Sequence, residues 1–170
     1  MIIKGKKVTL SPLSLKNIPK AWEWINDKEV TKFLISKPPK TYKGELKWFE
    51  TLKKSKTDKI FTITVNSTTT HIGNIGFHKI SKENSNCELG IMIGEKEYWN
   101  KGYGTDAIKT FLKYGFEKLH FHKIYLNVFT ENISAQKCYK KCGFKKVGYL
   151  KDHTKKGKEF WDEYIMEIIA

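Results

Sequence analysis

The chain has 170 residues, of which 39% are hydrophobic and 14% aromatic. This length suits one domain with its own core, residues 1–170, and the aromatic content excludes a disordered chain. No apolar run approaches the ~20 residues of a membrane-spanning helix. The start, Met1 to Lys7, lacks the apolar stretch of a signal peptide, so we expect a cytoplasmic protein without membrane contact.

The net charge is +14, from 32 basic and 18 acidic residues, and every basic residue is a lysine. Arginine is the usual bidentate ligand of phosphate, so a phosphate site here must use backbone N–H groups and lysine charges. The charge suits solubility, and it also suits an anionic ligand or a ribonucleoprotein surface. The three cysteines lack CxxC spacing, so we expect neither a disulfide nor a bound metal.

Hydrophobic periodicity predicts strands and helices in the first half of the chain. They are a strand over 7–13, a helix capped by Ser14, a helix opened by Thr41, and strands over 60–65, 71–80 and 87–93. The inner stripes of the two helices are predicted to be Ile18, Ala21, Trp22 and Ile25, then Tyr42, Leu46, Phe49 and Leu52. Asn26-Asp27 and 36–40, with Pro38-Pro39, are predicted loops.

In the second half, helices alternate with strands. The expected elements are a helix over 102–119, a strand over 123–129, a helix over 134–141, and strands over 144–150 and 160–168. Short polar turns join the strands of the first half, which makes those strands antiparallel. The crossover from 87 to 129 adds a parallel pair. The predicted fold class is therefore α/β, a mixed and mostly antiparallel sheet flanked by helices.

The strongest chemical signal is a glycine-rich loop over 98–107, between a strand and a helix. Gly102 and Gly104 let successive N–H groups point at one anion, the helix adds its own free N–H groups and dipole, and Lys101 adds a positive charge. A pyrophosphate fits such a loop. Residues 102–107 also match the dinucleotide fingerprint GxGxxG/A, but eight residues separate Gly102 from the end of the strand, whereas the fingerprint places its first glycine directly after the strand. A Walker loop is absent.

Two flanking segments support a ligand site. In the strand before the loop, Glu88, Gly90 and Met92 share one face, which leaves a groove for an extended ligand arm. After the next strand, Asn132 enters a short helix, and Tyr139 lies inside that helix.

The order of strand, W-x-K-G-x-G-T (99–105), amphipathic helix, strand and N-x-x-A-x-x-x-Y-x-x-x-G-F (132–144) resembles the GNAT superfamily of coenzyme A-dependent N-acyltransferases. The segments 10–13 and 24–30 resemble the branch with ribosomal-protein N-terminal acetyltransferases, and the second half resembles polyamine acetyltransferases. The superfamily's Gln or Arg is replaced by Trp99, which is common in the ribosomal-type branch.

The resemblance implies acetyl-CoA as cosubstrate and a set of residues that contact it. The backbone of 92–94 would hold the pantetheine arm, the loop would hold the pyrophosphate, and Asn132 would bind from the other side. The implied binding residues are Met92, Ile93, Gly94, Trp99, Asn100, Lys101, Gly102, Tyr103, Gly104, Thr105 and Asn132.

Acetyl transfer to an amine needs a neutral amine and a proton for the departing thiolate. The resemblance implies that Tyr139 supplies this proton. Glu88 is the candidate base, directly or through water, because its strand position points it toward the groove. Another base position in the superfamily corresponds roughly to Asn127, which cannot take a proton. A covalent acyl-enzyme on Cys138 is disfavoured, since no histidine lies at a spacing that implies a base.

These residues favour transfer of an acetyl group from acetyl-CoA to a primary amine of a small molecule or a protein N-terminus, by direct attack in a ternary complex. The alternatives are a non-catalytic basic RNA- or ribosome-binding module and a nicotinamide-dependent enzyme. A ribosome-associated substrate and a homo-oligomer stay open. The lysine-rich acceptor side disfavours a polycation unless Glu45, Glu50 or Glu88 forms an acidic pocket.

Overall fold

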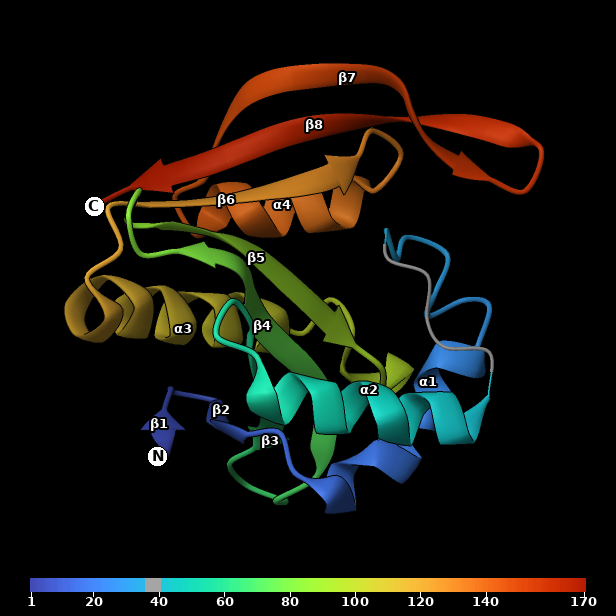
Figure 1. The fold of residues 1–170 in the computed structure, drawn as a ribbon, viewed down its shortest axis with the longest axis vertical. Helices are drawn as coiled ribbons and strands as arrows, with labels where there is room; N and C mark the ends of the chain where they lie inside the picture. Colours follow the sequence, from blue (N-terminus) through green and yellow to red (C-terminus); the bar gives the residue numbers. More distant parts are fainter. Residues whose placement is uncertain (36–40) are drawn as a thin grey trace.

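Eight strands form one sheet, in the order β1-β2-β3-β4-β5-β6-β8-β7 (Figure 1). The computed structural model describes residues 1–35 and 41–170. The strands are β1 (Ile3–Lys4), β2 (Val8–Pro12), β3 (Lys59–Val65), β4 (His71–Ser81), β5 (Asn86–Ile93), β6 (Lys123–Phe129), β7 (Lys145–Lys156) and β8 (Glu159–Ile169). The helices are α1 (Ile18–Asn26), α2 (Tyr42–Lys54), α3 (Tyr103–Leu119) and α4 (Ile133–Lys141), with 3-10 turns η1 (Leu15–Asn17) and η2 (Lys96–Tyr98).

The predicted fold class is confirmed, because β5 and β6 pair in parallel and the other strand pairs are antiparallel. The expected loop over 36–40 lies outside the described residues. Within the described part of the chain, no helix is both long and apolar enough to cross a bilayer.

The core lies between the sheet and α3. Phe111 of α3 stacks on Phe77 of β4, with ring centroids 4.0 Å apart, and meets Phe61 of β3 edge-on at 5.2 Å. Aromatic pairs of this kind contribute beyond the area that they bury. Helices α1 and α2 lie on the opposite face of the sheet (Figure 1), so the sheet is covered on both faces.

The parallel pair β5–β6 separates after three residues. Residues 86–88 pair with 123–125; beyond them β5 continues beside β4 to Ile93, while β6 continues beside β8 to Phe129. The two strands diverge toward their carboxyl ends (Figure 1). In open sheets, ligands bind outside the carboxyl ends of strands, and this fork in the sheet positions the site.

The inner stripes of α1 and α2 differ from prediction at three positions. Trp24, rather than Trp22, is buried in α1, because its ring packs on Gly94 and its Nε1 donates to the Glu95 carboxylate at 2.9 Å. Tyr42 is 40% exposed in the first turn of α2, and Glu45 is buried instead. Helical periodicity alone does not identify which tertiary partner faces each turn.

The closing hairpin is longer than predicted. Strands β7 and β8 extend to Lys156 and Glu159, which pair across a tight turn at Gly157, with φ at +64°. The sequence did not predict these strand ends because 151–158 is polar throughout. Both faces of the hairpin tip are largely exposed, so no alternation of apolar and polar residues marks the strands there. The tip extends past the other strands of the sheet (Figure 1).

Candidate active site

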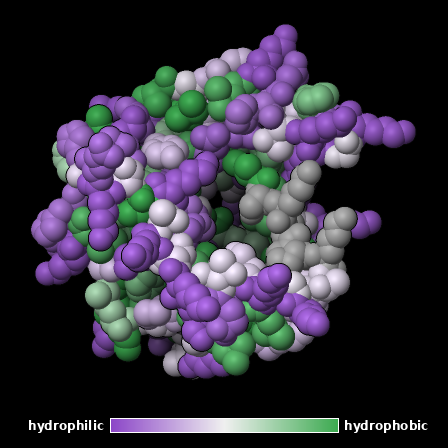
Figure 2. Space-filling view, viewed as in Figure 1, coloured by the Kyte–Doolittle hydropathy of each residue, from purple (hydrophilic) through white to green (hydrophobic). Residues whose placement is uncertain are grey.

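A cavity of about 760 Å³ lies at the fork between β5 and β6. Figure 2 shows this face of the molecule hollowed near its centre. The cavity is lined by Glu29, Val30, Lys32, Phe33, Leu34, Ile35, Ile91, Met92, Ile93, Tyr98, Trp99, Asn100, Gly102, Gly104, Thr105, Ile108, Asn127, Val128, Phe129, Asn132, Ser134, Ala135, Lys137, Cys138, Tyr139 and Lys141.

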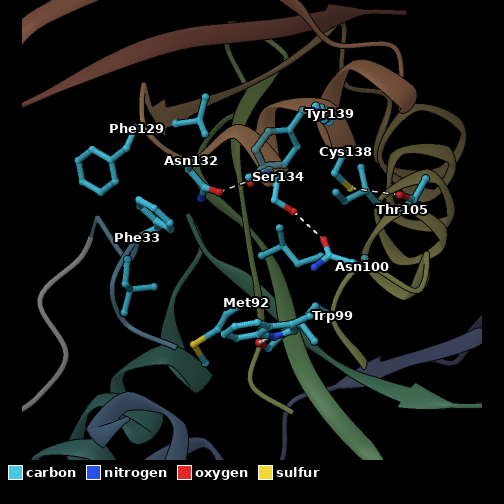
Figure 3. Close-up of a pocket in the computed structure, with 18 of the residues that line it drawn as sticks. Phe33, Met92, Trp99, Asn100, Thr105, Phe129, Asn132, Ser134, Cys138 and Tyr139 are labelled. Carbon is cyan, nitrogen blue, oxygen red and sulfur yellow. Dashed lines mark hydrogen bonds between the residues drawn. The ribbon is translucent and has the colours of Figure 1, made fainter. Parts of the chain in front are cut away.

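The cavity has two chemically different ends. We call the side formed by 98–105 and α4 the glycine-loop end, and the side formed by 29–35, Met92, Asn127 and Phe129 the 29–35 end. In Figure 3, Thr105 and Cys138 lie at the first end and Phe33 and Phe129 at the second, with Tyr139 between them.

The glycine loop turns through left-handed backbone at Asn100 (φ +57°) and Gly102 (φ +83°). Helix α3 then begins at Tyr103. The Asp106 amide makes the first hydrogen bond of the helix, to the Gly102 carbonyl at 3.0 Å. The amides of residues 103–105 therefore have no acceptor within the helix, and they lie at its positive end, where an anion can bind.

Side chains hold this loop against its neighbours. Trp99 donates from Nε1 to the Ile93 carbonyl at 2.7 Å, and Ser134 donates from Oγ to Asn100 Oδ1 at 3.0 Å (Figure 3). Asn132 caps α4 by accepting the Ala135 amide at 3.2 Å. The loop is thus fixed to both β5 and α4 before any ligand binds.

Eight of the eleven binding residues expected from the sequence line the cavity: Met92, Ile93, Trp99, Asn100, Gly102, Gly104, Thr105 and Asn132. The other three lie outside the lining. Gly94 is buried under Trp24, and its amide already donates to the Ile72 carbonyl at 2.8 Å. Lys101 is exposed, and Tyr103 packs edge-on against Tyr98.

These residues fit coenzyme A in its chemistry. The free amides of α3 suit a pyrophosphate, and Lys137 and Lys141 line the same end. A Cβ built on Gly104 meets no atom closer than Ile93 Cγ1, at 3.8 Å. The backbone of this turn is therefore open to the cavity.

Tyr139 lies in α4 and lines the cavity, although its side chain is only 8% exposed. Burial raises the pKa of its phenol, and the neighbouring thiols Cys138 and Cys142 raise it further. The phenol therefore carries its proton at neutral pH, as a proton donor requires.

Cys138 also lines the cavity, where its Sγ lies 3.2 Å from Thr105 Oγ1. A hydrogen bond from Cys142 lowers the pKa of the Cys138 thiol, and the bond from Thr105 lowers it further. Cys142 Sγ lies 3.7 Å from the Thr105 carbonyl. The thiol pair thus joins α4 to the start of α3.

Glu88 is not among the lining residues. It lies where β5 and β6 are still paired, opposite Tyr125, and its carboxylate forms an ion pair with Lys79 at 2.7 Å. Its side chain points to the same face of the sheet as that of Met92, as strand parity predicted. However, Glu88 lies near the start of β5, whereas Met92 lies near its end, at the cavity. This placement outside the cavity does not favour the prediction that Glu88 acts directly as the base.

The sequence indicated Asn127 only as a base position that cannot take a proton, and Glu163, its buried partner, was missed. Asn127 lines the cavity from β6, and its Nδ2 donates to Glu163 Oε2 of β8 at 2.8 Å. Glu163 is fully buried and also accepts from Thr154 Oγ1 at 2.5 Å. The available signal was Glu163 itself, a carboxylate among the apolar residues of the predicted strand 160–168. A carboxylate is buried only when it has partners, so its position indicated a buried polar contact.

Comparison with known proteins identifies the family. Residues 7–145 match the acetyltransferase (GNAT) domain family. The chain therefore belongs to the GNAT family, as its motifs indicated, and is an acetyl-CoA-dependent N-acetyltransferase. This decides against both alternatives, the non-catalytic RNA-binding module and the nicotinamide-dependent enzyme.

Individual relatives are distant. The chain is 29% identical over 170 residues to the uncharacterized N-acetyltransferase YnaD of Bacillus subtilis, covering 99% of this chain and 97% of that one. It is 37% identical over 79 residues, 46% of this chain and 45% of the relative, to a spermidine N(1)-acetyltransferase of Vibrio cholerae.

A solved spermidine N-acetyltransferase of Vibrio cholerae, in complex with CoA and spermine, superposes with a TM-score of 0.89. The two chains share 23% identity, and the match covers 96% of this chain and 95% of that one. At this identity the likeness establishes the fold and not the acceptor.

Proposed function

We propose that this protein transfers the acetyl group of acetyl-CoA to a primary amine by direct attack, with both substrates bound in the cavity at the β5–β6 fork. One observation carries the proposal: a single cavity joins the anion site of the glycine-loop end to the separate 29–35 end, and the protonated Tyr139 lies between them.

At the glycine-loop end, the amides of 103–105 would bind the pyrophosphate. The exposed edge of β5 at Met92 and Ile93 would hold the pantetheine arm, because β6 no longer pairs with β5 there. Bound in this way, acetyl-CoA supplies an activated acetyl thioester. The chain's own residues then need only to position it and to move protons.

Tyr139 would donate its phenolic proton to the leaving sulfur as the carbon–sulfur bond breaks and the carbon–nitrogen bond forms. It would recover a proton from solvent after the thiol leaves. Its raised pKa keeps the donor form available across the physiological range.

At the 29–35 end, we place the acceptor nitrogen beside Asn127. Glu163 accepts a hydrogen bond from Asn127 Nδ2, and this bond holds the amide of Asn127 with Nδ2 toward β8. This orientation leaves Oδ1 free to accept an N–H of the attacking amine. The proton that the amine loses goes to water, and Asn127 orients the nitrogen without taking that proton.

The test is a thiol-release assay with acetyl-CoA and a panel of primary amines, including peptides with a free N-terminus. We expect N-acetylated product, intersecting initial-rate patterns and no acetylated enzyme by mass spectrometry. Acetylated Cys138 and parallel initial-rate lines would overturn the direct-attack mechanism. Failure of CoA to bind would overturn the assignment of the cavity.

A further inference from the structure

Within the described residues, the carboxylates at the 29–35 end already share one lysine. The single acidic residue in the cavity lining, Glu29, bonds to Lys96 at 2.8 Å, and Lys96 also holds Asp27 at 2.8 Å. Of the three lysines in the lining, Lys32 lies at this end, and Lys137 and Lys141 lie at the glycine-loop end.

The three carboxylates expected to form an acidic pocket do not line the cavity. Glu50 pairs with Lys53 on the exposed side of α2, and Glu88 pairs with Lys79. Glu45 is buried in α2. Glu163 lies behind Asn127 and accepts two hydrogen bonds.

An ammonium group of the chain itself lies behind the lining of the 29–35 end, against the backbone of that segment. Lys156 Nζ, from the end of β7, lies near the carbonyls of Thr31 (3.3 Å), Lys32 (2.5 Å) and Leu34 (3.2 Å) and donates to them. It also lies 5.3 Å from the Phe129 ring centroid and 5.5 Å from that of Trp161.

Phe33 completes this aromatic cluster, 6.5 Å from Phe129 and 6.0 Å from Trp161. Carbonyl oxygens and aromatic faces are the groups with which proteins bind alkylammonium ions. Three donors meet three carbonyls, so Lys156 already uses the carbonyl and aromatic groups here that an ammonium of a polyamine could otherwise contact.

From this arrangement we infer that the acceptor is a monoamine with an apolar or anionic remainder, and that Lys156 determines this specificity. The inference rests on the proposed function and names the substrate class of the same site. The apolar side chains of Val30, Phe33, Leu34, Met92 and Phe129 would pack on the remainder of the acceptor. A second cationic centre would be desolvated beside the charge of Lys156, and the carboxylate in the lining, Glu29, already pairs with Lys96.

The experiment compares three primary amines of one shape: benzylamine, 4-(aminomethyl)benzoate and p-xylylenediamine, with spermidine as a fourth probe. Acetylation is followed by thiol release, and binding is measured by calorimetry with CoA present. For the wild type we expect the benzoate to exceed the diamine in kcat/KM and in affinity by about tenfold or more. Spermidine should rank with the diamine.

Lys156→Met removes the charge but keeps an unbranched apolar side chain. We expect it to reduce the preference for the benzoate over the diamine by about tenfold. Lys155→Met is the matched control, because Lys155 is exposed and lies over Phe160, and it should leave the ratio unchanged. Lys156→Gln keeps hydrogen-bond donors for the three carbonyls if the Met variant fails to fold.

Preference of the wild type for p-xylylenediamine or spermidine would overturn the inference while leaving the acetyltransferase function intact. An equal change of the ratio in Lys155→Met would also overturn the role of Lys156. Absence of CoA binding to the wild type would instead contradict the proposed function, so the two failures are distinguishable.

Discussion

The two ends of the cavity are built in different ways. The glycine-loop end consists of backbone from one continuous stretch, 98–105, together with the adjoining α4. The 29–35 end consists of side chains from three remote places, 29–35, β5 and β6, and residues of the β7–β8 hairpin bond to them from behind. Backbone amides at a helix start can bind a pyrophosphate whatever the side chains are. At the 29–35 end, each substitution changes the shape or charge of the cavity lining. This contrast explains why the glycine-loop end carries a family motif, whereas the 29–35 end has no such contiguous motif in the sequence.

The largest expected effect is at the glycine-loop end. Gly104→Glu should abolish CoA binding, because a carboxylate would enter the anion site. The fold should survive, since a Cβ at this position has room. Calorimetric titration with CoA checks this.

Gly104→Ala is the control and should bind CoA with only a modest loss, because it adds bulk without charge. Tight CoA binding by Gly104→Glu would show that the pyrophosphate is bound elsewhere.

The next effect lies between the two ends. Tyr139→Phe should lower kcat by ~10²–10⁴-fold, because it removes the proton donor and keeps the ring. Its CoA affinity should stay close to that of the wild type.

The pH profile sharpens this prediction. Burial raises the pKa of Tyr139, so its proton is lost only at a pH above the ordinary phenol value of ~10. The kcat of the wild type should therefore show no loss from this group up to about pH 10. Unchanged turnover in Tyr139→Phe would make the residue a packing group.

A smaller effect should appear at the 29–35 end. Glu163→Gln can donate as well as accept, so the Asn127 amide loses its fixed orientation. We expect kcat/KM for the amine to fall about tenfold, with CoA affinity unchanged.

Glu167→Gln is the matched control for this variant. Glu167 lies on the same strand and face and pairs with Lys123 away from the cavity. If Glu163→Gln lost CoA affinity or thermal stability in proportion to activity, its role would be structural, and Asn127 would not orient the amine.

The smallest effect is expected for Glu88→Gln. Its pair with Lys79, whose side chain is 73% exposed, contributes ~0–1 kcal/mol to stability, and Glu88 does not line the cavity. We expect kcat/KM within about twofold of the wild type at every pH. A large deficit near neutral pH that shrinks at high pH would instead identify Glu88 as the base, acting through water.

The sequence predicted the order of the major elements, because their periodicities are long and their turns are polar. It also located the cofactor-binding end, since a contiguous motif carries that chemistry. It did not reveal that Trp24 covers Gly94, or that Lys156 meets the carbonyls of 31–34 from more than 120 positions away. Nor did it join Asn127 to Glu163. Such contacts depend on tertiary packing, which local pattern does not encode.

We propose that the fork between β5 and β6 brings the two ends of the cavity to one reaction centre. A crystal structure of the CoA complex tests this arrangement. We expect the pyrophosphate on the amides of 103–105, the pantetheine arm along β5, and the thiol within hydrogen-bond distance of the Tyr139 hydroxyl. A thiol outside the fork, or out of reach of Tyr139, would contradict it.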